Sequence, residues 1–183
     1  MWEGDSALLT DPYQLNMLAA YLEHGLTETA VFELFVRKLP SHRGFLMAAG
    51  LEQAVQFLET LSFTSENLKA VRGLAQFSGS FIAWLQSFRF TGDVDAMPEG
   101  TVFFPDEPIL RVVAPLPEAQ FVETRLVNLL HFQTVVASKA ARMVLAAPGS
   151  PLIDYGLRRT HGAEAGYSPR GRVISPASTG QRR

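Results

Sequence analysis

The residue types best suited to chemistry lie in the stretch IDYGLRRTHG, residues 153–162. The pattern predicts a short strand that ends at Tyr155, turns at Gly156 and presents Arg158 and Arg159 in the following loop. In barrel and open-sheet enzymes, ligands bind at the carboxyl ends of strands. A guanidinium group matches phosphate or carboxylate oxygens in pairs, and a neighbouring aromatic face can stack on a flat ring. The stretch therefore indicates an anion site beside a stacking surface.

Other interpretations of the polar residues are open. The two arginines could be solvated or could pair with Asp154 and Glu164, because arginine pairs are common on protein surfaces. The four histidines do not have the spacing of a helical metal pair, so we expect no metal site. His131 lies inside a predicted helix, which favours a packing role, and His161 draws interest only through its position after the arginine pair.

Tyr13 directly follows Pro12 at a predicted helix start, where packing is the first interpretation of a large side chain. Lys139 and Arg142 close the longest helical pattern, where cations complement the helix dipole. The glycines form neither G-x-G-x-x-G nor G-x-x-x-x-G-K, and G-x-S-x-G is absent as well. The motifs therefore give no support to a glycine-rich phosphate loop or to serine hydrolase chemistry.

Composition is that of an ordinary globular chain of 183 residues, with 47% hydrophobic and 19% charged residues. The net charge of −2 supplies no field for binding nucleic acid or an acidic membrane. The absence of cysteine excludes disulfides and thiolate zinc sites. The N-terminus lacks the pattern of a signal peptide and no apolar run is long enough to span a membrane, so we expect a cytoplasmic protein.

The elements that must position these residues begin with a helix over residues 10–25. Asp11 can cap it, Pro12 suits its first turn, and Gly25 can end it. Leu15, Leu18 and Leu22 fall on one face of that helix. The run TAVFELFVRKLP, residues 29–40, predicts a strand buried on both faces for part of its length. The run RGFLMAAG, residues 43–50, predicts a second strand.

Helices and small strands are predicted over the remainder. LEQAVQFLETL, residues 51–61, predicts a helix with Leu51, Val55 and Leu58 inward. Further helices are expected over residues 63–74, with Thr64 or Ser65 as cap, and over residues 79–90. Glycine and proline punctuate short β-like runs over residues 92–115. The longest helix, residues 116–147, has an apolar stripe that comprises Phe121, Leu126, Leu129, Leu130, Gln133 and Val136. This order predicts an α/β or α+β fold.

Six segments, taken in order, resemble the N-terminal part of nicotinate phosphoribosyltransferase. They are TDPYQLNMLAAYLEHG, FELFVRKLP, RGFLMAAGLEQ, GDVDAMPEGTVFFPDEPILRVVAPLPEAQFVET, NLLHFQTVVASKAARMVLAA and DYGLRRTHGAEAG, which together cover nearly everything from Thr10 to Gly166. The resemblance implies an enzyme that joins nicotinate to phosphoribosyl pyrophosphate and forms nicotinate mononucleotide with ATP hydrolysis. This reaction brings nicotinic acid into NAD biosynthesis. One departure is Asp95, where family members commonly have a large or aromatic residue.

The resemblance implies an α/β fold with three parts. Residues 1–145 would form an N-terminal α+β lobe with a small β-rich layer. Residues 146–166 would begin a type II phosphoribosyltransferase α/β barrel, with LIDYG as its first strand. Residues 167–183 match nothing expected of the family and have the composition of a disordered tail. Family members are dimers with active sites at the subunit boundary.

Three binding residues are carried over by the resemblance. Tyr13 would reach the pyridine site of the neighbouring subunit, Tyr155 would stack on the pyridine ring, and Arg158 would grip the ribose phosphate. The catalytic residues themselves would lie beyond residue 166. No tightly bound cofactor is implied, because ATP and phosphoribosyl pyrophosphate act as co-substrates, with Mg²⁺.

The chain as given is expected to be a truncated, poorly active form of that enzyme. One alternative is a non-catalytic dimerisation fragment that lends Tyr13 to a full-length subunit. Another is a relative that uses quinolinate or nicotinamide, against which the segments FELFVRKLP and AMPEGTVFFP favour nicotinate.

Overall fold

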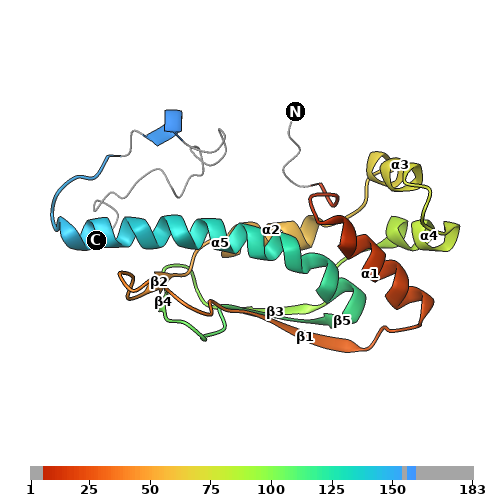
Figure 1. The fold of residues 1–183 in the computed structure, drawn as a ribbon, viewed down its shortest axis with the longest axis horizontal. Coiled ribbons are helices and arrows are strands. Elements are labelled where there is room, and N and C mark those ends of the chain that lie inside the picture. Colours follow the sequence, from red (N-terminus) through yellow and green to blue (C-terminus); the bar gives the residue numbers. More distant parts are fainter. Residues whose placement is uncertain (1–5, 154–155, 160–183) are drawn as a thin grey trace, which may run out of the picture.

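The computed structural model describes residues 6–153 and 156–159 of the chain. The elements in chain order are α1 (Pro12–Glu23), β1 (Thr29–Leu34), β2 (Leu46–Met47), α2 (Leu51–Thr60), α3 (Ser65–Gly73), α4 (Gly79–Ser87), β3 (Asp93–Ala96), β4 (Val102–Phe103), β5 (Leu110–Pro115), α5 (Leu116–Ala146) and the 3₁₀ helix η1 (Gly156–Arg159). Helix α5 runs along the length of the molecule, the strands follow one side of it, and α1, α3 and α4 gather at one end (Figure 1). The expected mixture of helix and sheet is confirmed.

Helix α5 is the element against which the others pack. It contacts α1, α2, β1, β2 and β5. Phe121, Leu126, Leu130 and Gln133 are buried as expected, whereas Leu129 and Val136 are only partly buried. Its inward face also includes Val122, which is completely buried. A stripe of this width is typical of a helix that covers a sheet and other helices at once.

Three antiparallel strands form the main sheet in the order β1-β5-β3. The expectation that the strand over residues 29–40 is buried on both faces for part of its length is wrong, and the strand itself ends at Leu34. Along β1 exposed residues alternate with partly buried ones, so that Val31 is 59% exposed while Phe32 packs inward. The reason is that α5 covers only one face of this sheet, and an antiparallel sheet with one covered face alternates in this way.

The outer face of the sheet carries a cross-strand charge group. Arg111 on β5 lies opposite Glu33 on β1 and opposite Asp95 on β3. Its Nη2 and Nε donate to Glu33 Oε1 over 2.7 and 2.9 Å. Asp95 is exposed on this face. The departure from the family pattern at Asp95 is therefore compatible with the fold.

A second, two-stranded sheet pairs β2 with β4. The strand expected over residues 43–50 is confined to Leu46 and Met47, and a small apolar cluster of Leu46, Ala48, Phe103 and Ile109 lies beneath it. The segment then leaves the strand and enters α2 through Gly50, whose φ is +102°. A side chain at Gly50 would approach Gln133 on α5 to 3.1 Å, so glycine suits both the backbone conformation and the space.

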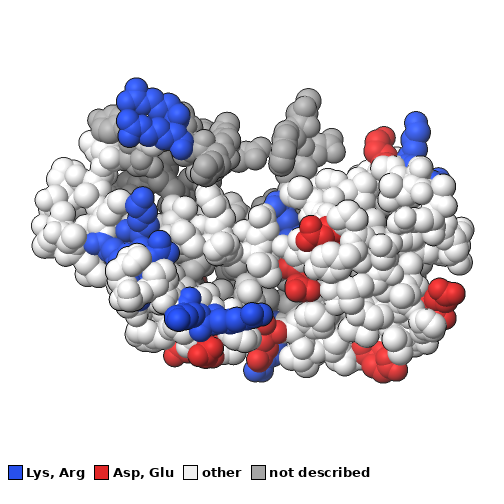
Figure 2. Space-filling view, in the orientation of Figure 1, with Lys and Arg blue, Asp and Glu red and all other residues white. Residues whose placement is uncertain are grey.

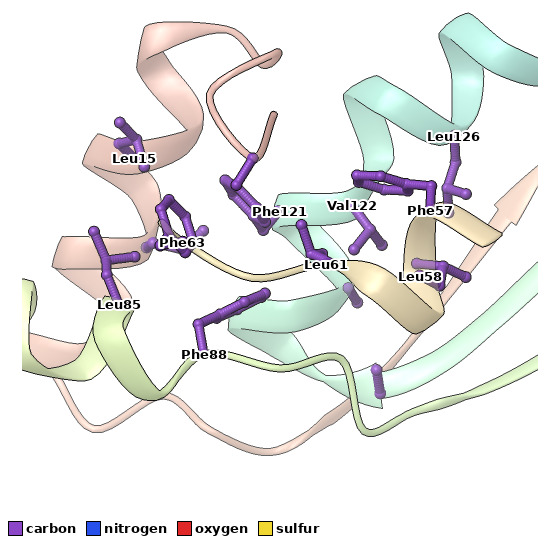
Figure 3. Close-up of a cluster of buried hydrophobic side chains, with 14 of the residues drawn as sticks. Leu15, Phe57, Leu58, Leu61, Phe63, Leu85, Phe88, Phe121, Val122 and Leu126 are labelled. Carbon is purple, nitrogen blue, oxygen red and sulfur yellow. The ribbon is translucent and has the colours of Figure 1, made fainter. Parts of the chain in front are cut away.

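The largest apolar cluster fills the space between α1, α2, α4, α5 and the main sheet. The rings of Phe63, Phe88 and Phe121 meet at its centre, with centroids 5.2–5.7 Å apart (Figure 3). Leu15 on α1 and Leu85 on α4 close one side of this group. Two of the ring pairs are edge-to-face, the geometry that the aromatic quadrupole favours.

The predicted residues at the ends of α1 and α3 occupy the expected positions, although not all of them make capping bonds. Thr64 Oγ1 accepts from Asn67 N, and Asn67 Oδ1 accepts from Thr64 N. The predicted cap of α3 is therefore a complete capping box. Pro12 begins α1 and Gly25 follows it with φ of +68°. Asp11 occupies the N-cap position of α1, but its side chain makes no capping bond.

Two sequence expectations differ from the structure at other elements. On α2 the inward residues are Ala54, Phe57 and Leu58, and Val55 is exposed, because α2 lies against α5 on a face rotated from the predicted one. The strand expected at LIDYG is not formed in the described part of that stretch. Residues 151–153 belong to no strand and η1 begins at Gly156. A strand requires ladder bonds, and no described strand lies beside this segment.

Candidate functional site

Tyr13 stands at the second position of α1 and is 48% exposed. Its neighbour Gln14 is completely buried. Successive helix residues point about 100° apart, so one can face α5 while the other stays at the surface. The start of α1 therefore presents an aromatic ring to solvent directly beside a buried amide.

The amide of Gln14 makes hydrogen bonds in three directions. Its Nε2 donates to Tyr13 Oη and to Thr124 Oγ1, each over 3.0 Å. Its Oε1 accepts from Gln120 Nε2 over 2.8 Å, and Gln120 Nε2 also donates to Glu123 Oε2 over 3.1 Å. These five residues, which we call the Gln14 network, connect the exposed Tyr13 to α5. The sequence interpretation treated Tyr13 alone and missed Gln14, although Gln14 stands next to Leu15 and four residues before Leu18 on the inward face.

The other predicted site residues lie elsewhere. Arg158 and Arg159 are both exposed in η1. Tyr155 falls outside the described residues, so its position relative to Arg158 stays a prediction. Helix η1 lies near the C-terminal end of α5, whereas α1 lies toward the opposite end of the molecule (Figure 1). The structure therefore does not bring Tyr13 and Arg158 together within one chain.

Positive charge gathers at the end of the molecule that holds η1. Between Glu123 and Ala146, helix α5 contains Arg125, Lys139 and Arg142 but no acidic residue. In Figure 2, blue side chains gather over the end with η1, β2 and β4, and red ones lie mainly along the lower edge and the other end. Arg142 Nη1 is buried and has no hydrogen-bond acceptor among the described residues. A surface of one sign raises the local concentration of anions.

The N-terminus of α2 is occupied by a side chain of the chain itself. Glu99 Oε1 accepts from Gly50 N over 3.1 Å and from Glu52 N over 3.3 Å. A carboxylate at this position satisfies free N–H groups and complements the helix dipole. This helix start is therefore closed to a ligand phosphate. Within residues 6–153 and 156–159, no group of three or more side chains could hold a metal ion.

Two hollows lie away from the predicted site residues. One of about 250 Å³ is bounded by β1, β5 and α5 and is lined by Phe32, Leu126 and Val127 among others. The other, of about 500 Å³, lies between α1 and α4 and has Phe77, Phe81 and Trp84 in its wall. Tyr13 and Arg158 line neither.

In the described part of the chain, no helix is both long and apolar enough for a membrane span.

Comparison with known proteins identifies the family. Residues 8–131 match the nicotinate phosphoribosyltransferase (NAPRTase) N-terminal domain. This match covers more than half of the chain, which therefore belongs to that family. Proteins named nicotinate phosphoribosyltransferase are its relatives, and the resemblance inferred from the six sequence segments is confirmed.

Individual relatives agree with this assignment. The chain is 54% identical over 159 residues to nicotinate phosphoribosyltransferase pncB2 of Mycobacterium tuberculosis, covering 87% of the chain and 34% of that protein. It is 41% identical over 160 residues to nicotinate phosphoribosyltransferase of Bacillus subtilis, covering 87% of the chain and 33% of that protein. The crystal structure of human nicotinic acid phosphoribosyltransferase superposes with a TM-score of 0.77 at 35% identity, covering 86% of the chain and 32% of that structure. The chain thus spans about a third of the length of these relatives.

Proposed function

We propose that this chain takes part in phosphoribosyl transfer to nicotinate, which forms nicotinate mononucleotide from phosphoribosyl pyrophosphate with ATP hydrolysis. The pyridine nitrogen would attack the anomeric carbon of the sugar while pyrophosphate leaves. The observation that carries the proposal is the family match over residues 8–131, with 54% identity to the Mycobacterium tuberculosis enzyme. The reaction would belong to NAD biosynthesis in the cytoplasm.

In this proposal Tyr13 serves the pyridine site of a neighbouring subunit, Tyr155 stacks on the ring, and Arg158 binds the nucleotide phosphate. Two features of the described chain support it. The Tyr13 ring and the Arg158 guanidinium are both exposed, as ligand contacts must be. The elements that carry them, α1 and η1, also lie apart in the molecule, which supports a site built from residues of two subunits (Figure 1). A homodimer with shared sites has this arrangement.

The residues proposed here act by position and charge. Positive charge develops on the sugar as pyrophosphate leaves, and a guanidinium group that holds phosphate oxygens fixes the reacting groups in line. Mg²⁺ would accompany the phosphate chain of the substrate. The described residues contain no group that could hold the ion, so no step is assigned to it.

The test is a turnover assay of the 183-residue chain alone and of its mixture with the full-length Mycobacterium tuberculosis relative, in which the turnover of the relative by itself is measured separately and subtracted. Nicotinate, nicotinamide and quinolinate are each supplied with phosphoribosyl pyrophosphate and ATP. We expect nucleotide to form from nicotinate, with a loss of at least about tenfold in kcat/KM on Arg158→Ala, since a charged phosphate contact is removed. Nucleotide formed only from nicotinamide or quinolinate would contradict the proposal.

A second candidate function is a non-catalytic dimerisation module. The apolar side chains of Met143, Leu145 and Ile153 at the far end of the molecule are 44%, 68% and 69% exposed. Apolar residues gathered in this way often mark contact surfaces. A stable mixed complex with the full-length relative on size-exclusion chromatography, without turnover by the chain alone, would favour this module.

A further inference from the structure

We propose that Gln14 is a positioning residue that makes the Tyr13 hydroxyl donate its hydrogen outward, toward an anionic oxygen of the ligand. The inference rests on the proposed function, because it assumes that Tyr13 faces a ligand. It adds a direction to that contact and names the residues that set it. The observations that carry it are the burial and the hydrogen bonds of the Gln14 network.

The direction is set first at Glu123. An ionised carboxylate accepts hydrogen bonds and cannot donate them, so the group of Gln120 that faces Glu123 must be its NH₂. The bond runs from Gln120 Nε2 to Glu123 Oε2 over 3.1 Å. The charge of Glu123 thus decides which way the Gln120 amide is turned.

The same nitrogen then determines the orientation of Gln14. The second hydrogen of Gln120 Nε2 goes to Gln14 Oε1 over 2.8 Å, in a buried environment. If the Gln14 amide were turned over, two NH₂ groups would face each other at this distance, and two buried donors would lose their acceptors. Gln14 must therefore present its own NH₂ to Tyr13 and Thr124.

Tyr13 is the last member of the series. Its oxygen accepts from Gln14 Nε2 over 3.0 Å, so its single O–H hydrogen is not used in that bond. Tyr13 as a whole residue is 48% exposed and its bond to Gln14 is only partly buried, so we infer that the hydroxyl can donate to a group outside the chain. The matching chemical class is a strong acceptor, a carboxylate or a phosphate oxygen.

A purely structural role for Gln14 is the competing explanation, since buried amides commonly satisfy a helix contact. The two roles differ in what they predict for Gln14→Glu. At a pH where the new carboxyl group is ionised, this change keeps the shape of the side chain and an acceptor for Gln120, but it replaces the donor that faces Tyr13 with an acceptor. The Tyr13 hydroxyl would then donate inward, and its hydrogen would no longer be available to a ligand.

The first measurement is independent of activity. Nuclear Overhauser contacts are recorded for the Gln14 side-chain NH₂ in the isotope-labelled chain. We expect contacts to the Tyr13 ring and the Thr124 methyl group, and weaker ones in Glu123→Ala, where the Gln120 amide is free to turn. Glu123 is exposed, so this variant should fold even if Gln14→Glu does not. Contacts to Gln120 in place of Tyr13 would overturn the inference.

The second measurement is KM for nicotinate in whichever preparation turns over, the chain alone or the mixture. Tyr13→Phe and Gln14→Glu should each raise KM by about tenfold, the loss of one hydrogen bond to a charged group, with kcat largely kept. Asn16→Ala, which removes an exposed α1 side chain bonded to Gln76, is the matched control and should leave KM unchanged.

The outcomes separate the inference from the proposed function. A rise in KM for Tyr13→Phe without one for Gln14→Glu overturns the role of Gln14 and leaves the function standing. An unchanged KM for Tyr13→Phe shows that the Tyr13 hydroxyl makes no contact with the ligand and overturns the inference, while the proposed function still stands. If the chain turns over no pyridine substrate alone and adds nothing to the turnover of the relative in the mixture, the proposed function fails together with the ligand contact.

Discussion

Single residues in this chain are constrained by what surrounds them more than by their own type. Gln14 would be an ordinary helix residue at the surface, yet here it is completely buried and bonded on both sides of its amide. Gly92, between α4 and β3, is also restricted by residues distant in sequence. A Cβ built there would lie 2.4 Å from Ala114 Cβ and 2.6 Å from Val113 O. Neither restriction can be read from the residue and its immediate neighbours in sequence.

Gly92→Ala should destabilise the fold by about 1–3 kcal/mol, because the new methyl group requires the backbone of β5 to move. The measurement is urea unfolding followed by circular dichroism. Gly73→Ala is the matched control, since a Cβ at Gly73 meets nothing within 4 Å and alanine favours the helix. Equal effects of the two substitutions would contradict the steric explanation.

Among the elements, α5 has a role beyond apolar packing. Two of its buried polar residues, Thr134 and Ser138, make hydrogen bonds to the backbone where β2 leads toward α2. Ser138 Oγ accepts from Met47 N over 2.8 Å, and Thr134 Oγ1 is bonded to Ala49 over 3.3 Å. Met47 N, in β2, and Ala49 N, beyond it, donate to side chains of the helix instead of to a neighbouring strand. This explains why the predicted strand over residues 43–50 is so short.

Ser138→Ala should cost about 1–3 kcal/mol of unfolding free energy, because Met47 N–H loses its acceptor away from bulk water. Thermal unfolding of purified protein checks this. Ser138 Oγ also donates to the carbonyl of Thr134 in its own helix. Ser87→Ala is the control, because Ser87 Oγ donates in the same way to Trp84 O but in an exposed place. A change of less than about 0.5 kcal/mol is expected for this control. A similar loss in both would refute the argument.

The two ends of the molecule differ in the side chains that they carry. One end holds the aromatic cluster, α1 and Tyr13, and the other holds η1, the distal part of α5 and much of the positive charge (Figures 1 and 2). The distal end also exposes apolar side chains of α5. Removing apolar surface from water when two chains associate lowers the free energy of the complex. We therefore expect the chain to self-associate through this end.

Leu145→Lys should reduce concentration-dependent self-association of the chain, measured by analytical ultracentrifugation. Leu145 is 68% exposed near the end of α5, and a charge there opposes burial of the surrounding apolar surface. Leu74→Lys, at a side chain 55% exposed beside α3, is the control and should leave association unchanged. Association that is lost equally in both variants would indicate a general effect of charge.

How much the sequence predicted depends on the range of the interactions involved. The α3 cap at Thr64, one of the two predicted cap residues, depends on a few neighbouring residues, as do the start of α1 at Pro12 and the left-handed Gly25 that follows it; these were predicted correctly. The order of helices and strands and the family also follow from local patterns. The inward face of α2 was predicted wrongly at Val55, because the face depends on where α5 crosses it.

The amino-acid sequence by itself therefore determined the helices, several of their ends and the family through short-range signals, but not the lengths of β1 and β2. Tertiary structure alone decided that β1 has one covered face, that Gln14 is buried beside the exposed Tyr13, and that α1 and η1 lie apart in the molecule. The physical reason is that burial and hydrogen-bond direction depend on contacts between residues distant in sequence, such as Gln14 and Gln120. Such contacts exist only once α1 and α5 have packed together.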